Sequence, residues 1–389
     1  MVQKLRTSVL KLTASPLARG SFVVLVGATV SNFANYIFNL SMGRMLGPAD
    51  YGTLAALAAV LSVVSVPSAA LATTVVKFTT EFKGKKSWGK ITTLLSSLSK
   101  VLVGLGVLVF LSFTLFQAPV AGFLRISPAS LIVLLGAMFL INFPQTVNNG
   151  ILQGLQKFKF LASNSILASA IKLGVGVGLV AKGYSVAGAM TAIFLSLMLP
   201  YWRTFFPLKF LKDKEHGEVN WVSMYRYAAP TFLTLLGMTL LISNDVVLVK
   251  KFFPAEEAGL YAALSLVGRV ILYATSSVVG VMFTLVAERQ AVNARYQHLL
   301  RLSLLLVGSF GSMATIFYFA FPNFVMRFFF GPKYLGSAQF LGFFAIFVTL
   351  YSLCNVLVNF FLSVRRTDVA WLTLLAAGAQ LLLITLFHR

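Results

Sequence analysis

Long apolar segments alternate with short polar ones along almost the whole chain of 389 residues. Most apolar segments carry almost no charge, and each approaches the length of about 20 residues that a helix needs to cross a bilayer. The pattern predicts eleven membrane-spanning helices and therefore an all-α polytopic membrane protein. The predicted spans are 21–42, 52–76, 101–118, 130–149, 161–181, 185–202, 227–249, 259–285, 302–321, 337–362 and 370–387.

The charge distribution assigns the two sides of the membrane. The composition is 58% hydrophobic and 11% charged, whereas a soluble domain carries about 25% charged residues. With the N-terminus (Lys4, Arg6, Lys11, Arg19) in the cytoplasm, 22 of the 32 Lys and Arg fall in inner segments, as the positive-inside rule requires. The net charge of +22 then needs no nucleic-acid partner. We expect a multi-pass protein of the inner (plasma) membrane.

One polar turn occurs twice. Residues 44–57 read RMLGPADYGTLAAL, and residues 251–264 read KFFPAEEAGLYAAL. Gly52 corresponds to Gly259, and each copy joins the first two spans of a group. Because six spans separate the copies, both lie on the same side, predicted to be the outside. In the first copy, Gly47–Pro48 predicts a helix break, since proline lacks an N–H and restricts the residue before it.

The repeat predicts two parallel six-helix lobes, an architecture that transporters use with the substrate site between the halves. Residues 1–205 form the predicted N-terminal lobe, 206–226 a basic cytoplasmic linker and 227–389 the C-terminal lobe. With eleven spans, the second lobe is expected to lack its last helix.

Three stretches carry a resemblance to a known family. They are GRMLGPADYGTLAAL (43–57), NGILQGLQKFKFLASNSIL (149–167) and PTFLTLLGMTLLISNDVVLVKKFFPAEEAGLYAAL (230–264). From about residue 19 to 370, the chain resembles the polysaccharide biosynthesis flippases of the multidrug/oligosaccharidyl-lipid/polysaccharide exporter superfamily. The resemblance implies alternating access between two lobes and transport of an undecaprenyl-diphosphate-linked oligosaccharide. It also implies membrane lipids and polysaccharide assembly proteins as partners. Members usually have twelve or fourteen spans, so the count of eleven departs from the pattern.

Ionisable residues within predicted spans are functional candidates, because a charge in the bilayer is costly unless it is paired or faces water. Lys172 and Arg269 are candidates for the diphosphate, since cationic side chains bind phosphate oxygens. Asp245 is the candidate for coupling to Na⁺ or H⁺. The structural alternative is an ion pair of Asp245 with Arg269 or Lys251.

Amide side chains recur at helical spacing in three spans. Stripes of amides can line a wet cavity and bind sugar hydroxyls, or they can join helices by hydrogen bonds. The candidate substrate-binding amides are Asn142, Gln145, Asn149 and Gln153 in span four, Asn32, Asn35 and Asn39 in span one, and Asn355 and Asn359 in span ten.

Other functions find little support in the sequence. The single cysteine and three scattered histidines do not predict a metal site. The sequence has no Walker loop and no carboxylate pair that would predict an enzyme. No cofactor is expected, with Na⁺ or H⁺ coupling left open. The competing function is a Na⁺- or H⁺-coupled multidrug exporter of the same superfamily, which needs acids for cationic cargo. Asp245 is the one acid within a predicted span, against two basic residues, which favours an anionic cargo.

Overall fold

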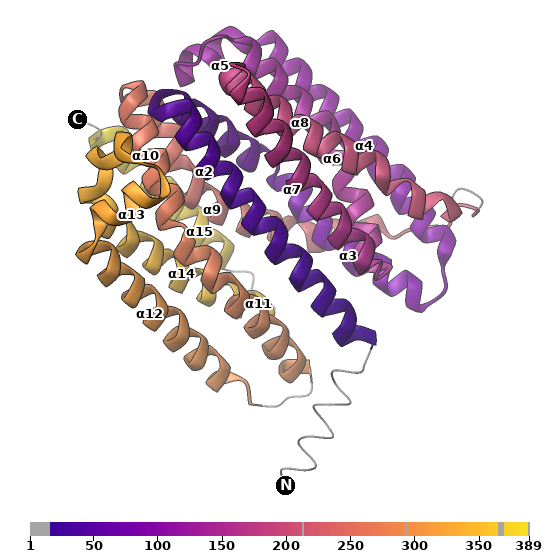
Figure 1. Ribbon diagram of the computed structural model, residues 1–389. Helices are drawn as coiled ribbons and strands as arrows, with labels where there is room; N and C mark the ends of the chain where they lie inside the picture. Colours follow the sequence, from indigo (N-terminus) through magenta and orange to yellow (C-terminus); the bar gives the residue numbers. More distant parts are fainter. Residues whose placement is uncertain (1–15, 212–213, 292–294, 365–368, 388–389) are drawn as a thin grey trace. The chain divides into compact units, whose positions relative to one another are not determined.

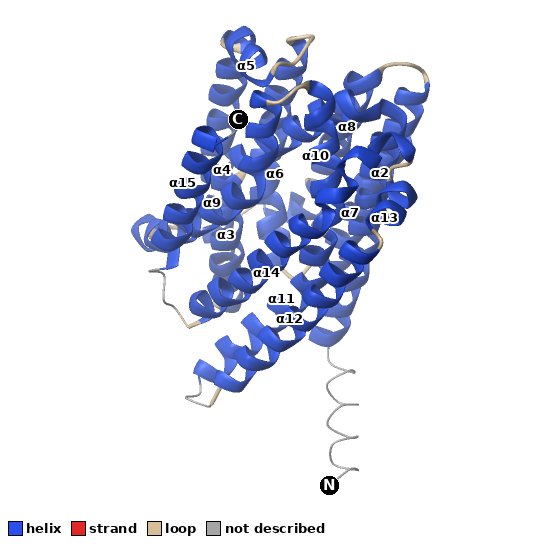
Figure 2. Cartoon of the chain, turned by 90° about the vertical axis from the view of Figure 1, so that its left-hand side faces the viewer, coloured by secondary structure: helices blue, strands red, loops and turns tan. Residues whose placement is uncertain are grey.

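The computed structural model describes residues 16–211, 214–291, 295–364 and 369–387. Their regular structure is entirely helical, as Figures 1 and 2 show. The predicted inner charges Lys4, Arg6 and Lys11 lie outside the described residues, as does the C-terminal dipeptide 388–389. The prediction of an all-α membrane protein is confirmed.

The chain forms two compact units, each assembled from separate stretches of sequence. Unit 1 comprises Met1–Met42, Pro67–Gly122 and Ile126–Ala229, and unit 2 comprises Gly43–Val66, Phe123–Arg125 and Pro230–Arg389. The second half of the first long helix therefore packs with unit 2, which the chain order alone does not indicate. The division into two six-helix lobes stays a prediction.

Unit 1 contains two closely packed helix pairs, α4 with α6 and α7 with α8. Small residues bring the first pair together: a Cβ on Gly106 would lie 3.0 Å from the carbonyl oxygen of Phe139. The helices that lie wholly or mostly in this unit are the first part of α2 (Pro16–Val64), α3 (Val66–Gly84), α4 (Trp88–Leu115), α5 (Gln117–Leu124), α6 (Ser130–Gly154), α7 (Phe158–Ala181), α8 (Ser185–Thr204) and the short 3₁₀ segment η1 (Phe206–Leu211).

The segment predicted as a basic linker packs against the start of α4. The hydroxyl of Thr92 donates to the Leu211 carbonyl at 3.1 Å, and that of Thr93 donates to the Gly217 carbonyl at 2.8 Å. These bonds fix Leu211 and Gly217 to unit 1.

In unit 2 an apolar cluster lies between α11 (Val270–Ala291), α12 (Gln297–Ala320) and α14 (Leu341–Ser363). It is built on Val279, Met282, Val286, Val307, Val356 and Phe360. The elements of unit 2 are the second part of α2, α9 (Trp221–Phe252), whose first residues belong to unit 1, α10 (Ala255–Gly268), α11 (Val270–Ala291), α12 (Gln297–Ala320), α13 (Pro322–Phe329), η2 (Pro332–Phe340), α14 (Leu341–Ser363) and α15 (Val369–Phe387).

Ten segments of the described residues are long and apolar enough to cross a membrane, against the eleven predicted. The difference arises at the N-terminal end, where Gly27–Val64 counts as one segment. The predicted break is confirmed at Gly47, with φ 76° and ψ 174°, but helix resumes at once. The predicted second span is instead interrupted at Ser65, and α3 begins at Val66.

The two copies of the repeated turn pack against each other within unit 2. A Cβ on Gly52 would lie 2.8 Å from the backbone nitrogen of Gly259, and a Cβ on Gly259 would overlap the carbonyl of Pro48. Arg44 binds the last carbonyls of α13, donating to Phe329 at 2.9 Å and also to Phe328. The glycines that the repeat aligns thus form one close helix crossing.

Candidate functional site

Three of the four amides predicted as a stripe on span four line one cavity of unit 1. Gln145, Asn149 and Gln153 project from α6 into a space of about 370 Å³. We call this space the amide pocket. Its remaining lining comes from α2, α7 and α8: Ala28, Phe158, Leu161, Ala162, Asn164, Ser165, Ala168 and Pro200. Asn142, the fourth residue of the stripe, is not among the lining residues.

The sequence of α6 explains why its amides face this pocket. Gly150 and Gly154 lie one position further round the helix and pack closely on α3. A Cβ on Gly150 would lie 3.0 Å from Val75, and one on Gly154 would lie 2.6 Å from Thr79. The glycine face therefore takes the tight helix contact and leaves the neighbouring amide face toward α7 and α8.

Two amide oxygens in the lining are buried without a hydrogen-bond partner among the described residues: Oδ1 of Asn149 and Oδ1 of Asn164. Asn164 is 4% exposed, and its Nδ2 donates to the carbonyl of Pro200 at 3.2 Å. Buried acceptors are normally satisfied. These two oxygens therefore keep unused acceptor capacity among the residues that line the pocket.

The adjacent residue Asn148 behaves differently. It is 1% exposed, and its Nδ2 donates to the hydroxyl of Thr204 on α8 at 2.8 Å. Asn148 thus joins two helices, whereas Asn149 faces the cavity. The stripe residue Asn149 thus lines a cavity, while Asn148 beside the stripe holds two helices together.

Lys172 lies in the middle of α7 and contacts the polar stripe of α2. Its Nζ donates to Oδ1 of Asn35 at 3.1 Å and lies 4.6 Å from the ring centroid of Phe38. Gly176, one turn further along α7, allows this approach, since a Cβ there would lie 2.6 Å from Phe38. The predicted Asn39 donates to the carbonyl of Asn35 at 2.8 Å.

No carboxylate pairs with Lys172 among the residues that the structure describes. Two salt bridges are present in that part of the chain, Lys85–Glu81 and Arg269–Asp245. Asn32, the remaining predicted residue of α2, is exposed. Lys172 is thus a cation within a membrane span whose neighbours are an amide and an aromatic ring.

Asp245 and Arg269, both in unit 2, are paired with each other. Nη2 of Arg269 lies 3.3 Å from Oδ1 of Asp245 and also donates to the carbonyl of Ile242. The hydroxyl of Tyr261 donates to Oδ2 of Asp245 at 2.9 Å. The structural alternative, an ion pair, is what the geometry shows.

Arg269 lies at a break between two helices. The predicted span 259–285 is two helices, α10 and α11, with Arg269 between them. The Tyr318 hydroxyl donates to the Val267 carbonyl, which lies next to the break, at 3.1 Å. The guanidinium Nε is buried without a partner among the described residues, so Arg269 keeps one unused donor.

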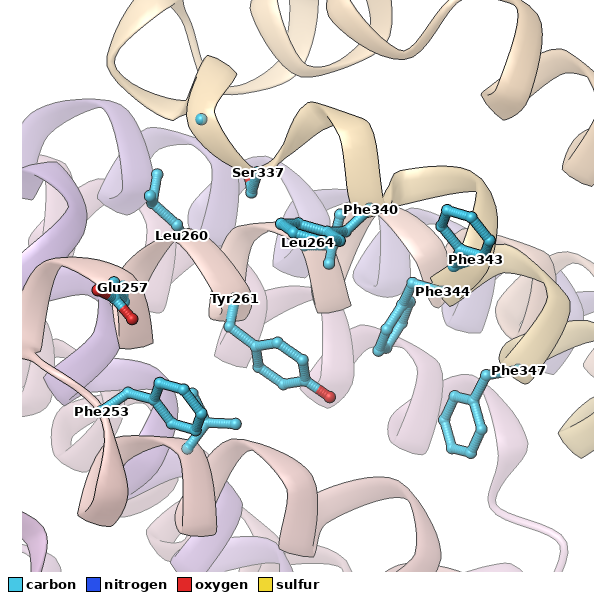
Figure 3. Close-up of a pocket in the computed structure, with 12 residues that line it drawn as sticks. Phe253, Glu257, Leu260, Tyr261, Leu264, Ser337, Phe340, Phe343, Phe344 and Phe347 are labelled. Atoms are coloured by element: carbon cyan, nitrogen blue, oxygen red, sulfur yellow. The ribbon is translucent and has the colours of Figure 1, made fainter. Parts of the chain in front are cut away.

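A second cavity lies in unit 2, beside this ion pair. Its volume is about 580 Å³, and half of its lining residues are aromatic. In Figure 3, Tyr261 lies between Glu257 on one side and Phe344 on the other, and Phe343 and Phe347 lie beyond Phe344. The Tyr261 hydroxyl is already bonded to Asp245, so the pocket offers apolar surface and few polar groups.

The last predicted amides, Asn355 and Asn359, bond to each other along α14. Nδ2 of Asn359 donates to both the carbonyl and the side-chain oxygen of Asn355, at 2.9 and 2.8 Å. Sequence reasoning missed Asn164. Its signal was its position two turns before Lys172, because residues four and eight apart share a helix face.

Comparison with known structures identifies the fold. The chain is similar to the lipid II flippase MurJ in an inward closed conformation, at 14% identity and a TM-score of 0.70, covering 93% of this chain and 81% of that one. It is also similar to an inward-facing multidrug resistance MATE family transporter of the MOP superfamily, at 16% identity and a TM-score of 0.66, covering 91% and 88%. The fold is that of these transporters.

Residues 17–288 match the model of the polysaccharide biosynthesis protein family. The chain belongs to this family, and it has the fold of multi-pass membrane transporters. A search of curated proteins finds no match. The family predicted from the three sequence stretches is confirmed.

Proposed function

We propose that this transporter flips a lipid-diphosphate-linked oligosaccharide, with undecaprenyl as the lipid, across the membrane by alternating access between two lobes. The observation that carries the proposal is Lys172, a cation within a span that has an amide and a ring, but no described carboxylate, beside it. An anionic group is the ligand that such a site favours.

Electrostatics makes this preference substantial. Two unit charges 4 Å apart attract by about 4 kcal/mol at the effective dielectric of a site near the protein surface. A cation in the bilayer without a counter-charge costs several kcal/mol. A diphosphate that reaches Lys172 supplies that counter-charge, and the hydrogen bond to Asn35 orients the ammonium group toward it.

The competing function, a Na⁺- or H⁺-coupled multidrug exporter, would require an acid available to a cation. Asp245 is 3% exposed, and both of its oxygens are engaged, by Arg269 and Tyr261. This arrangement favours an anionic cargo. Coupling to Na⁺ or H⁺ through Asp245 would require the ion pair to open.

The test is flipping in proteoliposomes. The purified chain is reconstituted with an undecaprenyl-diphosphate disaccharide, and an impermeant sugar-modifying enzyme is added outside. We expect the protein to expose the inner-leaflet lipid, which stays protected in protein-free vesicles. Protected lipid together with exchange of a cationic dye against a Na⁺ or H⁺ gradient would support the multidrug function instead.

Lys172→Gln should slow flipping about tenfold or more, since a hydrogen bond to a charged group contributes roughly 1.5–3 kcal/mol. The matched control is Lys182→Gln, which removes an exposed lysine just beyond the end of the same helix and should leave the rate unchanged. Equal rates for the two variants would refute the role of Lys172.

A further inference from the structure

The amide pocket has a lining of unusual chemistry for a membrane span. Every described residue that lines it is uncharged, and its polar side chains are four amides and one hydroxyl. A ligand that fits this lining is neutral and rich in hydrogen-bonding groups. The volume of about 370 Å³ falls within the range of small-molecule sites, roughly 300–1,000 Å³.

The two atoms without a hydrogen-bond partner indicate which hydrogen-bonding group a ligand must carry. Both of them, on Asn149 and Asn164, are oxygens, which only accept hydrogen bonds, so the complementary ligand must donate. Hydroxyl groups of a sugar are such donors. Phe158 and Leu161 add apolar surface, against which the C–H face of a sugar ring can lie.

Helix α7 contributes residues to the amide pocket and also carries Lys172. Ala168, in the pocket lining, lies four residues before Lys172, and Asn164 lies eight before it. At 1.5 Å per residue these separations are about 6 and 12 Å along the helix. Residues at these spacings share a helix face, so one glycosylated diphosphate can reach both features.

We propose that the amide pocket binds a neutral sugar ring of the cargo, with Asn149 and Asn164 accepting hydrogen bonds from its hydroxyl groups. The identity of the cargo rests on the proposed function. The chemistry of the pocket does not rest on the proposed function, because it follows from the uncharged lining and the two oxygens without a hydrogen-bond partner.

The first experiment tests the pocket without any lipid. In a Cys354→Ser background, Ser165→Cys places a thiol in the pocket lining of the full chain, held in nanodiscs. A hydrophilic maleimide reports access to this thiol. A panel of soluble neutral hexoses, N-acetylhexosamines, deoxyhexoses and their disaccharides should slow labelling at least threefold. Ser223→Cys, on the exposed start of α9, is the matched control and should label at an unchanged rate.

Side-chain variants assign the protection to the two oxygens. Asn164→Leu and Asn149→Leu, made separately, should each abolish it, while Lys172→Gln should retain it. Two variants are used because one of them can fail to fold, and monodisperse elution with a normal Tm is the criterion for folding. Slower labelling in NaCl than in KCl, without any sugar, would identify an ion site and overturn the proposal. The proposal would also be overturned if no sugar of the panel slowed labelling.

The second experiment separates this inference from the proposed function. Binding of undecaprenyl diphosphate, with and without a neutral disaccharide, is measured on the same nanodiscs. The sugar should raise the affinity of the wild type about tenfold, and both asparagine variants should lose that gain while keeping their affinity for the sugar-free lipid. Lys172→Gln should weaken both lipids by the same factor.

The outcomes are distinct. A wild type that binds both lipids equally would overturn the sugar subsite and leave the proposed function standing. A wild type that binds neither lipid but is still protected by soluble sugar would overturn the proposed cargo and support the pocket.

Discussion

The crossing of the two repeated turns is sensitive to a single methyl group. Replacing Gly52 by alanine places a Cβ 2.8 Å from the nitrogen and 3.0 Å from the Cα of Gly259, whereas favourable contacts between heavy atoms lie at about 3.5–4.0 Å. Both obstructing atoms are backbone, so no rotamer change relieves the overlap. The two helix segments must separate by about 0.5–1 Å.

Overpacking of this kind typically costs about 1–3 kcal/mol, and the backbone contact argues for the upper end. At about 2 °C per kcal/mol, Gly52→Ala should lower Tm by roughly 6 °C. The assay is thermal unfolding of detergent-solubilised protein, followed by the loss of the monodisperse peak. Gly378→Ala is the control, because nothing lies within 4 Å of its Cβ position and alanine favours a helix. Equal Tm values for the two variants would show that the crossing is loosely packed and that the reasoning is wrong.

Three further experiments test the contacts described above. Asp245→Asn leaves the charge of Arg269 without its partner and should lower the stability of the protein by about 2–4 kcal/mol. Adding Arg269→Gln to this variant should restore part of the lost stability. Additive effects of the two substitutions in this double-mutant cycle would contradict the pairing. Arg44→Ala should cost about 1 kcal/mol, since an exposed cation at a helix C-terminus contributes modestly; an unchanged Tm would argue against the bonds to α13. Asn148→Leu should lower stability by about 1–3 kcal/mol by removing a buried hydrogen bond, while Asn149→Leu should be nearly neutral in unfolding experiments; the reverse order would refute the distinction between the two residues.

The hydrophobic pattern predicted the helices well because membrane-spanning helices must satisfy every backbone hydrogen bond internally. The spans around α4, α6, α7, α8, α9, α12 and α15 were all found. Among these helices, the largest differences are at the starts of α4 and α9, which lie 13 and six residues earlier than predicted. Both helices continue into polar sequence beyond the apolar core.

Helix interruptions were harder to predict. The break at Gly47 has a clear local cause, a glycine with positive φ before a proline. The break at Arg269 has no such signal. Tyr318 hydrogen-bonds next to it, and Arg269 itself turns to Asp245, so the interruption depends on contacts that are distant in sequence.

In the candidate site, too, some features could be predicted from the sequence and others could not. The spacing of Gln145, Asn149 and Gln153 determined that they share one face of α6, because side chains four residues apart lie one above the other. The sequence could not determine that Asn148 pairs with Thr204 while Asn149 faces a cavity, or that Asn164 completes that cavity. Apolar residues surround a membrane helix on all sides, so hydropathy does not indicate which face meets protein.

By itself, the sequence determined the class of protein, the approximate number of spans, the repeated turn and the family, all of which depend on local composition and order. Only the tertiary structure decided that residues 43–66 pack in unit 2, that Asp245 is paired with Arg269, and that Lys172 has an amide and a ring rather than an acid beside it. These outcomes depend on which helix faces meet, and helix contacts in a bilayer are selected by close packing of small residues and by individual hydrogen bonds, which no single segment encodes alone.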